Sequence, residues 1–128
     1  MIFPELNDYS SWPLLLLRII VGIVFITSGW SHFTQPEKRS ESIGMSKSLT
    51  FILGLIEVIA SVGLILGIYV QIAALLLIGV MIGAISKKIF VWDTGFYAEK
   101  GFGWHYDSIL LAANLVFLFT GGGNLVII

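Results

Sequence analysis

Cysteine is absent from this 128-residue chain, and charged residues are scarce. Without cysteine the chain offers no disulfide, no thiolate nucleophile and no cysteine ligand for zinc or an iron–sulfur cluster. Charged residues make up 12% of the sequence and apolar residues 57%, against about 25% and about 45–50% in soluble domains. The mean hydropathy is +0.96. Because so few charges do not cover the surface of a soluble domain, the composition indicates an integral membrane protein.

Two further absences narrow the functions. The net charge is −1, so the sequence has no basic excess that predicts nucleic acid as a partner. A G-x-G-x-x-G loop after a strand is also missing, so no dinucleotide site is expected. We therefore expect a chain that is not catalytic on its own.

Long apolar segments dominate what is present. Residues 49–86 contain one charged residue, Glu57. As a single helix they would be about 57 Å long, against a hydrocarbon core of about 30 Å, so the chain must turn back at residues 67–71. The sequence predicts four membrane-spanning helices, at about residues 12–33, 49–67, 71–87 and 105–120.

These spans predict one all-α domain over residues 1–128, an integral membrane four-helix bundle with up-down topology and short loops. Six of the seven basic residues fall in the loops at 34–48 and 88–104 or directly at their edge, namely Lys38, Arg39, Lys47, Lys87, Lys88 and Lys100. The opposite side has Arg18 alone. By the positive-inside rule both loops are cytoplasmic and both termini lie outside, in a bacterial-type plasma membrane.

Glu57 is the most unusual residue within these segments. An ionisable group near the centre of a bilayer helix costs at least about 2.5–3.5 kcal/mol, so it normally faces the bundle interior. Gly54 and Ser61 share its helical face, which lets a neighbouring helix approach. Glu57 is either a proton-handling or ligand-binding acid, or a hydrogen-bonding group that holds helices together. Asn114 lies at a similar depth and is its expected neighbour.

Other polar residues complete the candidate cluster of Glu57, Asn114, His32, Asp107 and His105. Asp107 and His105 differ by about 200° around a helix, so a dyad between them is not expected. His32 is expected at the mouth of the first loop, as a hydrogen-bonding group. No H-x-x-x-H or E-x-x-H spacing predicts a metal site.

Arg18 is expected to be an interface anchor. The same-side partners available to it are turn carbonyls, the Ile128 carboxylate and lipid phosphates. A simple ion pair with Glu57 is not expected, because the two differ in depth by about 10 Å. On the third span, Gly79-x-x-x-Gly83 predicts close helix packing with no chemical role.

Several short motifs resemble the DoxX family. The first is Leu-Leu-Leu-Leu-Arg-Ile-Ile-Val-Gly at 14–22 with Gly29, and the second is Gly54-Leu-Ile-Glu57 with Gly63 and Gly67. The last two helices of that family are similar to two further parts of this chain. One contains Ala73-Ala74, and the other contains residues 103–113 and ends in the glycine triplet at 121–123. The resemblance covers nearly the whole chain.

The resemblance implies a four-helix membrane bundle of poorly defined function. Some members of the family resemble the small subunit of a thiosulfate:quinone oxidoreductase, and others accompany redox or stress proteins. Arg18 and Glu57 match recurrent charged positions, but no catalytic role comes with them. The chain departs from related thiol-redox bundles in lacking cysteine, and from many relatives in having His105 where an acidic residue is common.

Three functions follow as hypotheses. The first is a non-catalytic membrane subunit associated with a quinone-linked or other redox system, with a membrane-associated redox enzyme as partner. The second is a stand-alone binder or transporter of a small hydrophobic or protonatable solute. The third is a structural, partner-recruiting protein, with a homo-oligomer among the candidate assemblies. No resident cofactor is expected beyond a bound quinone or lipid, for which Trp30, His32, Glu57 and Asn114 are candidate hydrogen-bonding groups.

Overall fold

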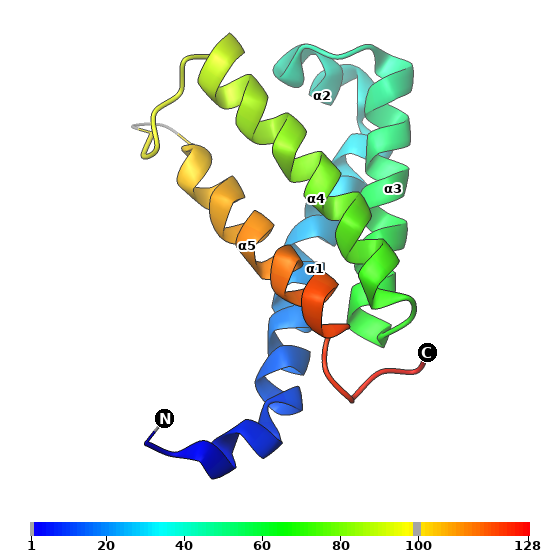
Figure 1. Cartoon of the computed structure of the whole chain (residues 1–128). Coiled ribbons are helices and arrows are strands. Elements are labelled where there is room, and N and C mark those ends of the chain that lie inside the picture. The colour runs from blue at the N-terminus through cyan, green and yellow to red at the C-terminus, as the bar shows by residue number, and fades with distance from the viewer. Residues whose placement is uncertain (1, 99–100) are drawn as a thin grey trace.

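The computed structural model describes residues 2–98 and 101–128, and these residues form helices with no β-strand. Four long helices make up the body: α1 (Ser11–Thr34), α3 (Lys47–Leu66), α4 (Val70–Ser86) and α5 (Trp104–Thr120) (Figure 1). Shorter segments join them: the 3-10 helix η1 (Pro4–Tyr9), helix α2 (Pro36–Ile43) and the π-helical turn η2 (Lys87–Val91). The all-α class is confirmed, and every long helix begins and ends within two residues of its predicted limits.

Helix α2 corrects the expectation of a loop at 34–48. Pro36 stands in its first turn, where the missing N–H is not needed, and Gly44 ends it with φ of 69°. The Gly44 N–H closes the helix on the Ser40 carbonyl at 2.9 Å. A short polar segment predicts a loop by hydropathy, but proline at its start and glycine at its end are the boundary residues of a helix.

Within residues 2–98 and 101–128, three helices are long and apolar enough to cross a bilayer: α1, α3, and α4 continued through η2. Their outer faces expose large aliphatic side chains, among them Leu16, Ile20, Ile59, Ile72, Leu75 and Ile82. Water does not cover an apolar surface of this extent in a monomeric domain, whereas lipid does. The molecule is therefore an integral membrane protein.

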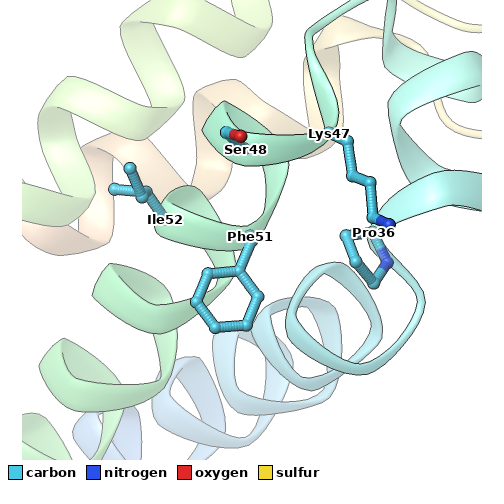
Figure 2. Close-up of a pocket in the computed structure, with 5 residues that line it drawn as sticks. All are labelled: Pro36, Lys47, Ser48, Phe51 and Ile52. Atoms are coloured by element: carbon cyan, nitrogen blue, oxygen red, sulfur yellow. The ribbon is translucent and has the colours of Figure 1, made fainter.

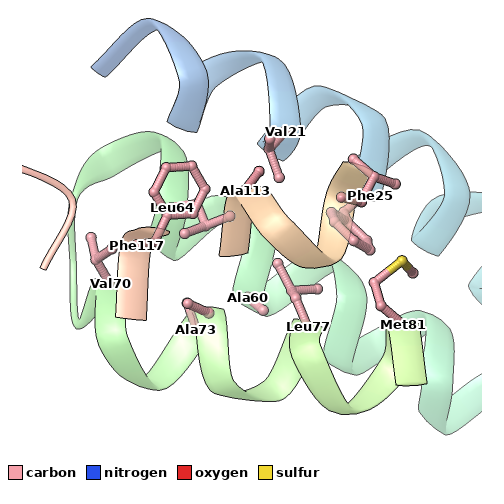
Figure 3. Packing of buried hydrophobic residues seen from close by; sticks show 12 residues of the cluster. Val21, Phe25, Ala60, Leu64, Val70, Ala73, Leu77, Met81, Ala113 and Phe117 are labelled. Atoms are coloured by element: carbon pink, nitrogen blue, oxygen red, sulfur yellow. The ribbon is translucent and has the colours of Figure 1, made fainter. Parts of the chain in front are cut away.

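A hydrophobic core joins all four long helices (Figure 3). Leu64 of α3, Leu77 of α4 and Phe117 of α5 are fully buried in it. The cluster continues to Phe25 of α1 and Met81 of α4. The helices are thus held together by apolar packing over the part of the bundle next to the α3–α4 turn.

The chain seals this end of the bundle with its own C-terminal tail. Gly67, with φ of 76°, turns the chain from α3 into α4. Its carbonyl accepts hydrogen bonds from the backbone N–H groups of Ile127 at 2.9 Å and Ile128 at 3.1 Å. The Ile128 carbonyl accepts from the Tyr69 N–H at 3.0 Å. The tail therefore supplies partners for a turn that would otherwise leave polar groups unpaired.

Arg18 is fully buried beneath this tail. Its guanidinium donates to the carbonyl of Leu64 at 3.3 Å and to the carbonyl of Leu125. Of the three expected kinds of partner, backbone carbonyls near the turn are the ones it uses. Its side chain is enclosed by protein rather than extended to the lipid interface, and it joins α1 to α3 and the tail.

Candidate functional site

Close packing of α1 on α3 builds the polar centre of the molecule. A Cβ added at Gly29 would lie 2.7 Å from the Glu57 Cβ and 2.9 Å from the Gly54 carbonyl oxygen. A Cβ at Gly54 would lie 2.5 Å from the Phe33 nitrogen and 2.8 Å from the His32 Cβ. Because the two glycines let the backbones touch, side chains that follow them on the two helices meet.

His32 and Glu57 are the pair that this crossing brings together. Both are buried, with 5% and 2% of their surface exposed, and His32 Nδ1 lies 3.2 Å from Glu57 Oε2. The prediction that Glu57 faces the interior is confirmed. Ser61, the small residue one turn further on, is also buried and donates to the Glu57 backbone carbonyl.

The contact between His32 and Arg39 of α2 determines which ring nitrogen of His32 carries the proton. Its Nη2 lies 3.3 Å from His32 Nε2. A guanidinium only donates hydrogen bonds, so Nε2 accepts and the ring proton lies on Nδ1. Nδ1–H then donates to the Glu57 carboxylate. The result is a hydrogen-bonded series, Arg39–His32–Glu57, which runs from the polar helix α2 to a carboxylate about 15 Å along α3 from its start at Lys47.

A cavity of about 1010 Å³ opens beside this pair. Its wall includes both His32 and Glu57, and parts of α1, α2, α3, α4, η2 and α5 contribute. Apolar side chains form one portion of the lining: Val24, Phe25, Leu53, Val80, Met81 and Leu110. Polar and ionisable side chains form another: Thr27, Ser28, Ser31, His32, Arg39, Glu57, Lys87, Lys88, Tyr106 and Asp107. Small-molecule sites typically combine an apolar enclosure with a few polar groups in this way.

The π-helical turn η2 places two lysines on the cavity wall. Lys87 and Lys88 begin the turn, which closes with the Trp92 N–H donating to the Lys87 carbonyl at 2.8 Å. Lys88 Nζ forms an ion pair with the buried Asp107 of α5, at 2.7 Å from Oδ2. Lys87 Nζ lies 6.0 Å from the centre of the Trp92 ring. The wide turn thus continues α4 past its regular end and connects it to α5.

Three of the five candidate cluster residues line the cavity, and two do not. His32, Glu57 and Asp107 contribute to its wall. Asn114 is fully buried and donates to the Leu110 carbonyl of its own helix at 2.8 Å. His105 Nδ1 lies 2.6 Å from the Phe96 carbonyl oxygen, so His105 and Asp107 have separate partners, as predicted.

The expected Glu57–Asn114 contact is not found in the described part of the chain. The two residues have similar depths, but α3 packs against α1 and α4, whereas α5 packs against α4 and α1. Equal depth therefore does not bring them together. Trp30, another expected hydrogen-bonding group for a ligand, has 60% of its surface exposed and does not line the cavity; its ring lies 6.1 Å from that of Phe33, in a tilted arrangement.

Gly79 and Gly83 correct a second prediction. They were expected to pack a helix closely, yet a Cβ built at either position would meet no described atom within 4 Å beyond the adjoining backbone of α4 itself. Both are exposed and both line the cavity. Their missing side chains open the rim of the cavity on α4.

A smaller hollow of about 400 Å³ lies on the outer surface between the first residue of α2 and the first turns of α3 (Figure 2). Pro36, Lys47, Ser48, Phe51 and Ile52 line it. Its charged residue, Lys47, donates to exposed Glu37 at 2.7 Å, and this contact keeps the pKa of Glu37 below its ordinary value. No buried ionisable group of the described structure contributes to this hollow, so the larger cavity is the candidate site.

Residues 2–98 and 101–128 contain no group of three or more histidine and carboxylate side chains placed to hold a metal ion. The sequence reasoning missed Arg39, Lys87, Lys88 and Tyr106 as parts of the site. Arg39 lies seven residues after His32, a spacing of two helical turns, but it falls beyond Pro36 in the segment that the sequence predicts as a loop. For the two lysines, the positive-inside rule predicts the side of the membrane but no place in a site.

The fold and the site together define a class: small helical integral membrane proteins with a polar-lined cavity inside the bundle. The DoxX family model matches residues 13–93, and the chain belongs to the DoxX family. An uncharacterized membrane protein of Mycobacterium tuberculosis (strain ATCC 25618 / H37Rv) is 29% identical over 138 residues, which cover 89% of this chain and 84% of that protein. No solved structure matches the chain significantly.

Proposed function

We propose that this DoxX-family protein is a non-catalytic membrane protein that binds one small apolar or amphipathic molecule in the cavity beside His32 and Glu57. The observation that carries the proposal is a volume of about 1010 Å³ that meets a buried, hydrogen-bonded ionisable pair. Drug-sized ligands occupy pockets of about 300–1,000 Å³. A cavity of this size with both apolar and polar walls suits a molecule with one polar end.

We also propose that α5 is a fourth span. Its 17 residues correspond to about 25 Å, near the short end of the range for membrane helices. Its outer face exposes Ile109 and Phe119, which are 66% and 82% accessible. Its first turn carries the Asp107–Lys88 ion pair at the same end as η2, which supports a bundle with all four long helices in the bilayer.

The proposed orientation has α2 and η2 in the cytoplasm and both termini outside. Lys38, Arg39, Lys47, Lys87 and Lys88 gather at this one end of the bundle, whereas Arg18 lies near the other. Lys100, the sixth basic residue expected on this side, lies outside the described residues. A C-terminal alkaline phosphatase fusion should be active and a C-terminal fluorescent-protein fusion dark. The opposite result would reverse the orientation and leave the number of spans unchanged.

A quinone is the specific ligand that would connect the protein to a redox system. Quinone head groups need an apolar slot and a few hydrogen-bonding groups, and the cavity wall combines the His32–Glu57 pair with apolar side chains such as Phe25 and Met81. In this version the chain is a membrane subunit that binds quinone beside a partner redox enzyme and transfers no electrons itself. A neighbouring gene for such an enzyme would support this version over a stand-alone binder.

Titration of delipidated protein in a nonionic detergent with a short-chain quinone analogue tests the proposal. Binding should raise the unfolding temperature and quench the fluorescence of Trp92, which lines the cavity. Ser28→Phe fills the cavity from α1 and should abolish both effects. Ile23→Phe is the matched control, because Ile23 is half exposed on α1 and does not line the cavity.

Failure of the quinone alone would leave the cavity open to other small molecules. A panel of co-extracted lipids and apolar solutes is therefore tested on the same three proteins. If no compound in the panel stabilises the wild-type chain, or if Ser28→Phe binds as well as Ile23→Phe, the proposed function is wrong.

A further inference from the structure

The N-terminal segment η1 lies outside the packed body of the bundle. Its six residues, Pro4–Tyr9, include no buried side chain. Figure 1 shows η1 bent away from the axis of α1, at the end of the bundle where the C-terminal tail lies. The Asn124 N–H of that tail donates to Ser11 Oγ at 2.9 Å, which fixes the start of α1. The segment η1 therefore leaves the bundle next to its closed end, with its side chains exposed.

The large apolar residues of this segment repeat every three positions. Phe3, Leu6, Tyr9 and Trp12 each have 63–64% of their surface exposed. A 3-10 helix has three residues per turn, so side chains three apart lie above one another. Leu6 and Tyr9 thus lie on one line of η1, and Phe3 and Trp12 adjoin this line at the same spacing. In an α-helix the same residues would drift by about 60° at each step.

The remaining faces of η1 are not apolar in this way. The positions between the four large residues are proline or polar, namely Pro4, Glu5, Asn7, Asp8, Ser10 and Ser11. Glu5 and Asp8 are themselves three residues apart, so the two carboxylates share a second line. The segment is therefore amphipathic in the period of the helix that it forms, with an apolar line and an acidic line.

The apolar line continues into the lipid-facing side of α1. Trp12, Leu16, Ile20 and Ile23 lie within about 80° of arc on that helix, and each is at least half exposed. The 24 residues of α1 correspond to about 36 Å, against a hydrocarbon core of about 30 Å, so the ends of α1 reach the membrane interface. Tryptophan and tyrosine are enriched at that depth. A lipid surface is the partner that extends the same contact past Ser10.

We infer that η1 lies in the interfacial layer of the bilayer, with Leu6 and Tyr9 toward the hydrocarbon and Glu5 and Asp8 toward water. The partner is a lipid surface, and the apolar line from Phe3 to Trp12 is the surface that binds it. Because the charges of η1 are acidic, neutral head groups suit it and anionic lipid is not required. The inference does not rest on the proposed function, since no residue of η1 lines the cavity.

The absence of cysteine allows each position to be labelled singly. Full-length variants with one cysteine at position 5, 6, 7, 8 or 9 carry a nitroxide in phosphatidylcholine vesicles. Electron paramagnetic resonance measures collisions of the label with oxygen, which concentrates in lipid, and with a water-soluble nickel chelate. Ile23→Cys is the lipid-facing reference, and Glu41→Cys on the polar helix α2 is the aqueous reference. Oxygen should exceed nickel at Leu6 and Tyr9, and nickel should exceed oxygen at the other three positions.

A pair of matched variants tests the apolar line itself. Leu6→Asp places a carboxylate on this line, so a label at Tyr9→Cys should lose its preference for oxygen. Asn7→Asp adds the same charge on a polar face and should leave that preference unchanged. Neither variant should alter unfolding of the bundle, because η1 buries no residue.

The contrary outcomes are distinct. Nickel exceeding oxygen at all five positions would place η1 in water and overturn the inference. Few collisions with either reagent at Leu6 and Tyr9 would show that protein, such as a second copy of this chain, covers the apolar line, and would also overturn it. A preference for oxygen without the repeat of three, or one that Leu6→Asp does not change, would show that the apolar line does not bind the membrane.

Discussion

Each end of α1 buries a polar side chain, but the two side chains have partners of different kinds. Arg18 and His32 are 14 residues apart, about 21 Å along the helix, and are 0% and 5% exposed. Arg18 donates to two backbone carbonyls under the C-terminal tail. His32 lies between a guanidinium and a carboxylate, beside a cavity of about 1010 Å³.

The difference lies in what can change at each end. Backbone carbonyls cannot titrate or move away without unfolding the turn and the tail, so the Arg18 end is a fixed structural closure. The partners of His32 are side chains of separate helices, and the wall beside them is open. Burial of a charge is therefore poor evidence of function by itself, and the combination of burial with an adjoining cavity is better evidence.

Loss of Arg18 should have the largest effect on stability. Arg18→Met removes two charge-assisted hydrogen bonds and leaves the Leu64 and Leu125 carbonyls without the guanidinium, at a cost of roughly 3–6 kcal/mol. Chemical unfolding in mixed micelles measures this cost. Arg18→Lys, which keeps the charge but lacks the planar fork, should fall between the variant and the wild type. A Met variant as stable as the wild type would show that the Arg18 end of α1 is not a structural closure, and the contrast with the His32 end would fail.

The glycines give a second contrast, within the helices themselves. Gly54→Ala places a methyl group 2.5 Å from the backbone of Phe33, which cannot yield easily, so we expect a loss of about 1–3 kcal/mol. Gly79→Ala meets open space and replaces a poor helix former, so it should be neutral or stabilising by up to about 1 kcal/mol. The same unfolding assay measures both. Equal losses at the two positions would mean that the α4 rim is packed.

Substitutions of Glu57 test whether the His32–Glu57 pair has a structural or a functional role. Glu57→Leu leaves the buried Nδ1–H of His32 without an acceptor and should cost about 1–3 kcal/mol. Glu57→Gln keeps an acceptor and should cost less than about 1 kcal/mol. If the Gln variant is stable but loses bound ligand, the ionisable group matters for binding. A Gln variant that is stable and binds normally would make Glu57 a structural hydrogen-bonding group only.

The sequence predicted the features that depend on position along a single helix. It missed those that also depend on which helices are neighbours in the bundle. Apolar lengths located all four long helices, and the small residues around Glu57 predicted its burial. Depth along the bundle then suggested Asn114 as its partner. The true partner, His32, depends on which helices are neighbours around the bundle, and no periodicity within a single helix contains that information.

The glycine motifs also show that spacing within one helix does not predict the contacts between helices. Gly79-x-x-x-Gly83 has the spacing of a packing motif but faces open space. The close contact instead joins Gly29 and Gly54, which are on different helices and form no motif with each other. Arg39 was missed for a related reason, since α2 is too short and polar for its role to follow from hydropathy. Spacing shows that two residues share a face, not what the face meets.

Asn114 should have the smallest effect, and it sharpens the contrast with Glu57. Its amide group donates to the Leu110 carbonyl, which belongs to the same helix, and its Oδ1 has no partner among the residues that the structure describes. Asn114→Leu removes an unsatisfied buried oxygen and fills a similar volume, so the free energy of unfolding should stay within about 1 kcal/mol of the wild type. Ligand binding should also be unchanged, because Asn114 does not line the cavity. Chemical unfolding and the quinone titration measure the two quantities, and Asn114→Asp, which buries a charge at the same position, is the control that must destabilise. A Leu variant that unfolds as readily as Glu57→Leu would contradict this prediction. It would show that the Asn114 amide holds α5 to a neighbouring helix and does more than bond within α5.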